Sequence, residues 1–137
     1  MDISRESAIR FVEYYYGTFN KNYRKQVTQR ENLIQLYTDE SLLSYQDAKL
    51  AGREKIMEYL LKDTLSQQVK EPFSIKSIPS ENNCVFIQVL GDTYFNDEDI
   101  QAEDILKLSF AESFYIKLNP DLNSFTIKTQ IFSQFGI

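Results

Sequence analysis

The sequence contains no histidine and no tryptophan, one cysteine, three prolines and four glycines among its 137 residues. Histidine is the commonest general base and metal ligand, so its absence excludes a Ser-His or Cys-His catalytic pair within this chain. Cys84 has no second cysteine to pair with, which excludes an intramolecular disulfide and is typical of a reducing compartment. The same two absences exclude a zinc site built from the usual ligands.

Other short signals are missing as well. The glycines are isolated from one another, so no phosphate-binding glycine loop is present. No apolar run approaches the roughly 18 residues of a membrane-spanning helix, and the first six residues lack the basic and then apolar pattern of a secretory signal. We therefore expect no cofactor, no metal ion and no membrane partner, and a location in the cytoplasm or the nucleus.

Acidic and aromatic residues are well represented. Fifteen basic and 20 acidic residues give a formal charge of −5, which disfavours a nucleic-acid-binding face and favours proteins or neutral ligands as partners. Nine tyrosines and ten phenylalanines provide large rings for pockets and interfaces. A chain of this length typically forms one core, so we expect a single domain over residues 1–137.

The spacing of apolar residues changes along the chain. Up to about residue 65 the spacing is helical, and after Glu71-Pro72 it alternates with the period of a strand. The pattern predicts helices over 4–19, around 33–37 and over 53–65, a short strand at 42–45, and longer strands over 73–78, 84–95, 106–118 and 125–132. Helices followed by a meander of strands indicate an α+β fold, with the helices on one face of an antiparallel sheet.

The predicted strands have apolar side chains on both faces. In 106–118 the even positions are apolar apart from Glu112, and this side is expected to lie under the helices. Apolar residues also occur on the opposite side, where a sheet facing only water would be polar. We therefore predict a covered second face, most economically covered by another copy of the chain, although scattered apolar surface residues are also normal. The expected dimer face comprises Gln88, Ala111, Ser113, Tyr115, Ile127 and Ile131.

Glu112 is the candidate catalytic residue, because a desolvated carboxylate on an apolar face can act as a general base. Tyr16, Tyr45 and Asp47 could join it around a cavity. The alternative is a structural glutamate that is hydrogen-bonded to a buried tyrosine or lies at a cavity mouth. No second acid or base shares a recognisable spacing with it, which favours the structural role.

Several segments, in order along nearly the whole chain, resemble the nuclear transport factor 2 family. Residues 8–16 resemble the first-helix signature, with a Phe followed by a Tyr-Tyr pair, and Leu36-Tyr37 resembles the end of the second helix. Residues 41–45 and 50–56 resemble the short strand and the glycine-led third helix. Residues 88–91 and 110–116 are similar to the core strands, which usually contain Phe-x-Gln-x-Phe. The resemblance implies a cone-shaped α+β fold, with three helices on one face of a curved antiparallel sheet, an apolar cavity and dimerisation through the open face.

The resemblance also implies candidate binding residues. Tyr45-Gln46 occupies the place of an aromatic–acid pair at the cavity rim, so the rim acid is missing here. A second acidic element that contacts a protein partner corresponds to Asp97, Glu98 and Asp99, although a solvated hairpin tip is an equal alternative for this acidic loop. The cavity is expected to involve Phe11, Tyr15, Phe110, Glu112 and Phe114. The alternative is that these rings fill the core and leave no void, since rings at helical and strand spacing often belong to a core.

The function implied by the resemblance is that of a non-enzymatic, dimeric adaptor in nucleocytoplasmic transport, either an import carrier for GDP-bound Ran or an mRNA-export cofactor. Ran, a nucleoporin or an export receptor would be its partner, and it would occur in the cytoplasm and nucleus, including nuclear envelope pores. One alternative is the N-terminal dimerisation and peptide-binding domain of a ribonucleoprotein or stress-granule protein or of a ubiquitin-protease cofactor. Another is an isomerase or dehydratase that uses Glu112. The sequence leaves the family branch open, together with the choice between homodimer and heterodimer.

Overall fold

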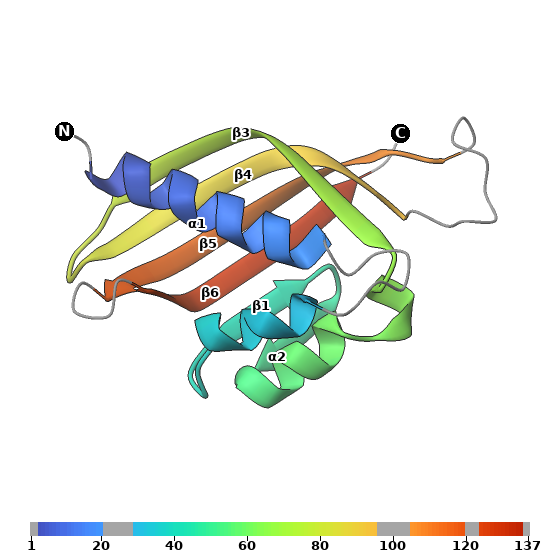
Figure 1. Ribbon diagram of the computed structural model, residues 1–137, viewed down its shortest axis with the longest axis horizontal. Coiled ribbons are helices and arrows are strands. Elements are labelled where there is room, and N and C mark those ends of the chain that lie inside the picture. Colours follow the sequence, from blue (N-terminus) through green and yellow to red (C-terminus); the bar gives the residue numbers. More distant parts are fainter. Residues whose placement is uncertain (1–2, 21–28, 96–104, 120–123, 136–137) are drawn as a thin grey trace.

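The computed structural model describes residues 3–20, 29–95, 105–119 and 124–135. Both α-helices and 3-10 helices (η) occur together with six strands (Figure 1). In chain order the elements are α1 (Ile3–Asn20), η2 (Arg30–Leu36), β1 (Leu42–Tyr45), β2 (Ala48–Ala51), α2 (Arg53–Leu60), η3 (Asp63–Leu65), β3 (Gln68–Pro79), β4 (Cys84–Phe95), β5 (Leu108–Asn119) and β6 (Ser124–Phe135).

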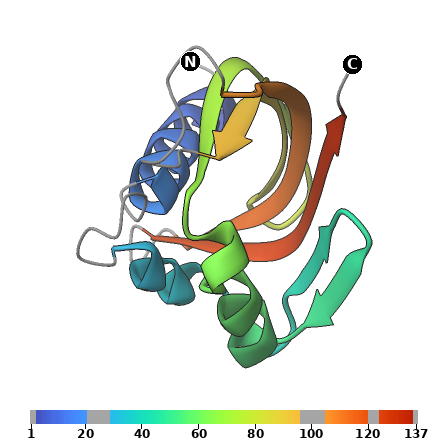
Figure 2. The same cartoon turned by 90° about the vertical axis from the view of Figure 1, so that its right-hand side faces the viewer.

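The six strands form one sheet in the order β2-β1-β6-β5-β4-β3. All neighbouring strands are antiparallel except β1 and β6, which are parallel. Seen along its side, the sheet is strongly curved, and the helices gather on one face of it (Figure 2). The predicted α+β fold, with helices on one face of a curved antiparallel sheet, is confirmed. Its one parallel pair arises because the hairpin β1–β2 joins the sheet beside β6.

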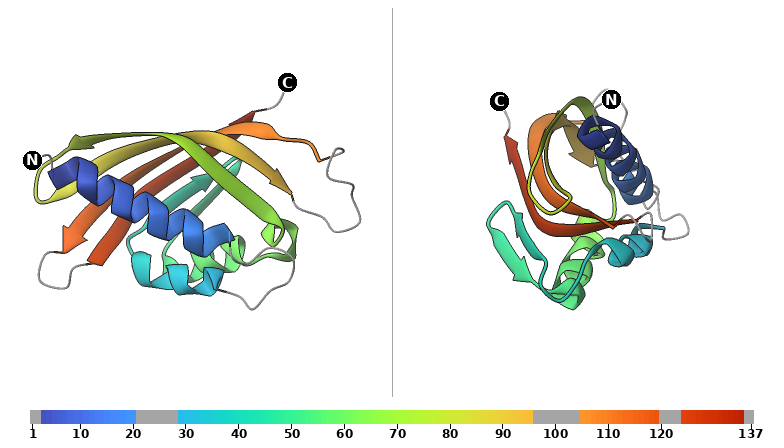
Figure 3. Two further views of the ribbon diagram at one scale, coloured as in Figure 1. Left: turned by 45° about the horizontal axis from the view of Figure 1, so that its top comes forward. Right: turned by 90° about the vertical axis from the view of Figure 1, so that its left-hand side faces the viewer.

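Helix α1 places one apolar stripe against the sheet and lies beside β3 (Figure 3). The stripe is fully buried and comprises Ala8, Phe11, Val12, Tyr15 and Phe19. At the end of the helix, the Asn20 side chain donates to the Lys70 carbonyl at 2.7 Å and accepts from the Lys70 N–H at 2.9 Å. Asn20 thus supplies a hydrogen-bonding partner for the free edge of β3.

None of the described helices has the length and apolarity needed to cross a bilayer.

A buried arginine joins the helix ends to the sheet. Arg30 is wholly buried, and its guanidinium donates to the carbonyls of Phe19, Leu60, Leu65 and Gln68 at 2.7–3.2 Å. These carbonyls lie at or near the last residues of α1, α2 and η3 and at the first residue of β3, where helix ends leave acceptors without intrahelical partners. Burial lowers the pKa of Arg30 to about 10. The side chain therefore stays charged at neutral pH and stabilises the convergence of four elements.

Gly91 permits close contact between β3, β4 and β5. A Cβ atom at this position would lie 2.3 Å from the Glu71 carbonyl oxygen and 2.6 Å from a ring carbon of Phe110. The irregularity of β3 between Pro72 and Ser74 lies directly opposite Gly91. Because glycine has no side chain, this position leaves space for the bend of the edge strand.

Candidate protein-binding face and buried polar centre

The strand register defines the face of the sheet that lies opposite the helices. Side chains on paired residues point to the same side, and every second residue along a strand shares that side. We call this the outer face. One row across all six strands contains Ile78, Phe86, Tyr115, Thr129, Leu42 and Ala51. The next row contains Lys76, Gln88, Ser113, Ile131, Ser44 and Lys49, and a third, shorter row contains Leu90, Ala111 and Ser133.

Large apolar side chains on the outer face are open to solvent in the single chain. Ile78, Phe86 and Ile131 are 66%, 52% and 48% exposed, respectively. The Phe86 and Tyr115 rings lie 4.4 Å apart between centroids, so together they form a continuous aromatic surface. Contiguous exposed apolar surface of this kind marks interaction sites more often than solvent-facing surface. The outer face is therefore the candidate interface with a protein.

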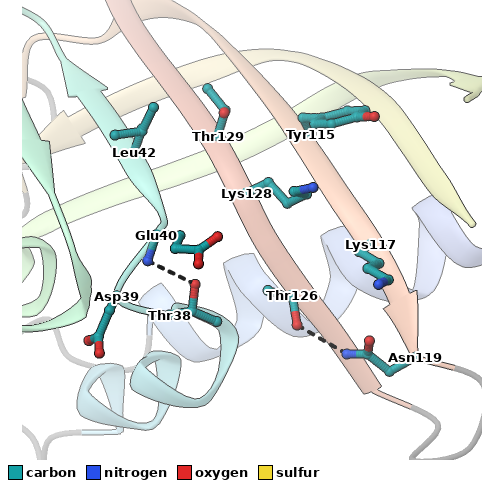
Figure 4. Close-up of a pocket in the computed structure, with 10 residues that line it drawn as sticks. All are labelled: Thr38, Asp39, Glu40, Leu42, Tyr115, Lys117, Asn119, Thr126, Lys128 and Thr129. Carbon is teal, nitrogen blue, oxygen red and sulfur yellow. Dashed lines mark hydrogen bonds between the residues drawn. The ribbon is translucent and has the colours of Figure 1, made fainter. Parts of the chain in front are cut away.

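An open pocket of about 730 Å³ lies where the outer face meets the loop before β1 (Figure 4). Asp39 and Glu40 lie on the loop side, and Lys117 and Lys128 extend from β5 and β6. In the described part of the chain, no ion pair joins these lysines to these carboxylates. The pocket therefore presents both signs of charge on separate walls.

A second, apolar groove of about 350 Å³ adjoins this pocket and shares Leu42 and Thr129 with it. It lies between the β1–β2 hairpin and β6. Leu43, Leu50 and Ile131 contribute to its lining. Charged and apolar recesses thus run side by side along one margin of the outer face.

The structure places five of the six predicted dimer-face residues on the outer face, namely Gln88, Ala111, Ser113, Tyr115 and Ile131. The placement of Ile127 was wrong, because this side chain is 0% exposed and belongs to the core. In β6, Thr129 pairs with Tyr115 and Ile127 with Ile116, so Lys128 is an extra residue in a bulge. Because of this extra residue, Ile127 and Ile131 face opposite sides of the sheet, whereas unbroken alternation would place them on the same side.

Glu112 lies at the centre of a buried polar network on the inner side of β5. Its Oε1 accepts hydrogen bonds from Tyr16 at 2.7 Å and Lys70 Nζ at 3.1 Å, and its Oε2 accepts from Gln130 Nε2 at 2.6 Å. Gln130 Nε2 also donates to the Tyr15 hydroxyl at 2.8 Å. The structural alternative for Glu112, hydrogen bonding to a buried tyrosine, is confirmed by this geometry. Asp47, a proposed neighbour of Glu112, is an exposed residue of the β1–β2 turn.

Lys70 is the cation that balances Glu112. Both side chains are wholly buried, and Lys70 Nζ also approaches Oε2 at 3.3 Å. The aromatic rings of Tyr15, Phe19, Tyr45 and Phe132 surround the same ammonium group. Burial lowers the pKa of Lys70 to about 8, and the Glu112 carboxylate acts in the opposite direction.

The predicted cavity residues come together in the core. Phe11 contacts Phe114 edge-on at 4.9 Å, Tyr15 contacts Phe114 at 5.0 Å, and all the predicted cavity rings are buried. Phe110 lies beside Phe132 at 5.7 Å. Rings and the Lys70 side chain therefore occupy the region where the sequence predicted an apolar cavity.

The predicted rim residues have different surroundings from those expected. Tyr45 is only 2% exposed, stacks on Phe132 at 4.3 Å and donates a hydrogen bond to Gln68 Oε1, so it is a core residue and not an open rim. Gln46 is exposed and has a φ of 56°. Its side-chain amide accepts from the Gln134 N–H at 2.8 Å and donates to the Gln134 carbonyl at 3.3 Å, which continues the ladder beside β6. Asp97, Glu98 and Asp99 lie outside the described residues.

Sequence reasoning missed Lys70 and Arg30. Lys70 directly precedes the exposed Glu71-Pro72, a context typical of a loop, and its partner is 42 residues away. The available signal was Glu112, the single acid on the apolar face of β5, because a buried carboxylate requires a cation nearby to compensate its charge. Arg30 follows a basic segment, and its acceptors are backbone carbonyls that no side-chain pattern reveals.

Residues 7–134 match the family model described as nuclear transport factor 2 (NTF2) domain. A protein of Candida glabrata named nuclear transport factor 2 is 29% identical over 126 residues, which cover 91% of this chain and 89% of that protein. The solved structure of nuclear transport factor 2 from Cryptosporidium parvum superposes with a TM-score of 0.79 at 24% identity and covers 98% of this chain and 96% of the other. The crystal structure of the yeast UBP3-associated protein BRE5 gives a TM-score of 0.74 at 14% identity, with 94% of each chain covered. At these identities the two structures demonstrate the same fold.

Proposed function

Because the chain belongs to the nuclear transport factor 2 domain family, we propose that it is a non-enzymatic, dimeric adaptor that binds protein partners and acts in nucleocytoplasmic transport. The observation that supports this most is the outer face, where Ile78, Phe86 and Ile131 are about half exposed or more in the isolated chain. Burial of apolar surface drives most protein association. A protein partner would remove these side chains from water.

The first partner is a second copy of the chain. A two-fold interface brings the same surface together from both subunits, so opposite charges separated on one surface can pair across it. The pocket with Asp39 and Glu40 on one wall and Lys117 and Lys128 on the other has this property. In the proposed dimer the carboxylates of one copy approach the lysines of its partner, while Phe86, Tyr115 and Ile131 pack at the centre.

A charge-exchange experiment tests this dimer. One variant has Asp39→Lys with Glu40→Lys, and the other has Lys117→Glu with Lys128→Glu. Each variant alone should be monomeric by light scattering, because like charges then face each other, and an equimolar mixture should form a heterodimer. Glu13→Lys, on the exposed side of α1, is the control and should remain dimeric. A wild-type chain that is monomeric at high micromolar concentration would eliminate the homodimer and leave a heterodimer with a related chain.

Within nucleocytoplasmic transport we favour an import carrier for GDP-bound Ran, since the Candida glabrata relative named nuclear transport factor 2 is matched over most of both chains. Titration calorimetry with purified Ran should give binding in the GDP-bound and not the GTP-bound state. Binding to an mRNA-export receptor domain, with no response to either form of Ran, would transfer the chain to the export-cofactor branch. A fluorescently tagged chain should occur in cytoplasm and nucleus and accumulate at nuclear envelope pores.

A second candidate function is that of a dimerisation and peptide-binding domain in a ubiquitin-protease or ribonucleoprotein complex. The likeness to BRE5, a protein described as UBP3-associated, favours this alternative at the level of fold. Co-purification of the tagged chain with a ubiquitin protease, in the absence of Ran and nucleoporins, would support it. An isomerase or dehydratase is disfavoured, because the Glu112 carboxylate is buried and its oxygens already accept bonds from Lys70, Tyr16 and Gln130.

A further inference from the structure

The ammonium group of Lys70 lies inside a cage made of side chains from several elements. Its Nζ is 4.2 Å from the centroid of the Phe132 ring, 4.3 Å from that of Phe19 and 4.7 Å from that of Tyr45. The Tyr15 ring is 6.0 Å away. The Glu112 carboxylate completes the surroundings. We call these four rings and the carboxylate the ammonium cage.

This combination is the one that proteins use to recognise cationic amines. The faces of aromatic rings carry partial negative charge and attract a cation, most strongly when the cation is removed from water. A carboxylate adds a charge-assisted hydrogen bond, which aromatic rings alone do not provide. The ammonium cage has both components, and it lies in a position where no solvent competes.

We infer that the centre of this domain is a binding site for a primary ammonium ion, and that the chain itself supplies the ligand as the side chain of Lys70. The wild-type site is consequently closed to other ligands. Removal of the lysine side chain beyond Cβ should create a vacant site for small primary alkylammonium ions.

The way in which Lys70 is held supports the role of an internal ligand. The side-chain amide of Asn20 holds the Lys70 backbone on both sides of Cα, because it donates to the Lys70 carbonyl at 2.7 Å and accepts from the Lys70 N–H at 2.9 Å. Lys70 belongs to β3, an edge strand, whereas the cage residues come from α1, β1, β5 and β6. One element therefore inserts the cation, and the other elements form the receptor.

The test uses Lys70→Ala and n-propylammonium chloride. Alanine retains Cβ, so the missing Cγ, Cδ, Cε and Nζ correspond atom for atom to n-propylammonium. We expect a saturable increase in the Tm of Lys70→Ala relative to sodium chloride at equal ionic strength, and no increase for wild type. The neutral analogue 1-propanol should bind at least about tenfold more weakly, because its hydroxyl can donate to Glu112 but brings no positive charge to the carboxylate or to the faces of the rings.

Two further variants separate binding in the cage from a general solvent effect. Lys70→Met fills the space without a charge and should not respond to n-propylammonium. Lys70→Ala with Glu112→Gln should lose the preference for the amine over 1-propanol. If Lys70→Ala is unfolded, near-ultraviolet circular dichroism should show that n-propylammonium restores its structure. Equal effects of the amine and the alcohol, an equal response of wild type, or no response of Lys70→Ala in either assay would overturn the inference.

Discussion

The ammonium of Lys70 and the carboxylate of Glu112 are 3.1 Å apart, and neither side chain has any exposed surface. The chain contains a useful counterpart in Lys107 and Glu71, which are 3.6 Å apart and 58% and 52% exposed. Exposed pairs contribute little because water and salt screen them. In a buried pair each charge depends on the other, since removal of one leaves an uncompensated charge in a medium of low polarity.

Replacement of one member of the buried pair should therefore be costly. We expect Lys70→Met to lower the free energy of unfolding by about 3–5 kcal/mol, measured by urea denaturation. Lys107→Met should change it by less than about 1 kcal/mol. The double variant Lys70→Met with Glu112→Gln should recover much of the loss, because neither position then carries an uncompensated buried charge. Equal effects of the two single substitutions would show that the Lys70–Glu112 pair is solvated.

Much of the fold follows from patterns that are local in sequence. The limits of β4 match the predicted strand over 84–95, and the even positions of β5 face the helices as its alternation predicted. The placement of Glu112 on the inner face follows from the same alternation. Each of these features depends on residues within one element, where side-chain period reports the direction of burial directly.

Features that depend on distant or backbone partners could not be predicted in this way. The bulge at Lys128 is set by pairing with β5, so local alternation placed Ile127 on the wrong face. Strand β2 was not predicted, because its four residues gain their ladder only from pairing with β1. Lys70 was missed and Tyr45 was misplaced for a similar reason, since several elements together form the surroundings of each side chain.

Arg30 should be more important for stability than other arginines. Replacement by methionine retains part of the apolar stem but leaves the carbonyls of Phe19, Leu60, Leu65 and Gln68 without this donor. Each buried unsatisfied polar group costs about 1–3 kcal/mol, so we expect a loss of at least about 4 kcal/mol in the free energy of unfolding.

Arg53 is the matched control for Arg30. Arg53 is exposed, and its side chain donates to the Tyr37 carbonyl at 2.7 Å. Arg53→Met should cost about 1 kcal/mol. A loss for Arg30→Met no larger than that for Arg53→Met would mean that water reaches the four carbonyls.

Two glycine-to-alanine substitutions should change the free energy of unfolding in opposite directions. At Gly91 an added Cβ would overlap the Glu71 carbonyl oxygen at 2.3 Å, so the β3 bend must shift, and we expect destabilisation by about 1–3 kcal/mol. At Gly17, in the interior of α1, an added Cβ meets nothing within 4 Å. Alanine there should stabilise the chain by about 0.5–1 kcal/mol through helix propensity. Thermal and urea denaturation measure both effects, and stabilisation by Gly91→Ala would contradict the close approach.

The stability of the chain should depend on alkaline pH through buried tyrosines. Burial, more than any other cause, raises the pKa of the hydroxyls of Tyr15, Tyr16, Tyr37 and Tyr45. In the unfolded chain tyrosine ionises near its ordinary pKa of about 10. Above that pH the folded chain binds more protons than the unfolded chain, so stability falls as pH rises, by about 1.4 kcal/mol per pH unit for each of the four tyrosines.

Lys70 acts with the opposite sign and in a lower range. Its pKa is about 8 in the folded chain, against 10.5 for an ordinary lysine, so between these values the unfolded chain binds more protons and stability rises with pH. Arg30, with a lowered pKa of about 10, acts in the same direction as Lys70 above pH 10 and raises stability as pH rises. There the four buried tyrosines lower stability by more than Arg30 raises it. Urea denaturation across a pH series should show a rise from about pH 8 towards 10 and a steep decline above it, with tyrosinate absorbance from the four buried rings appearing only on unfolding. Lys70→Met should lack the rise and keep the decline, and a wild-type stability that falls steadily from pH 8 would contradict the assignment of the rise to Lys70.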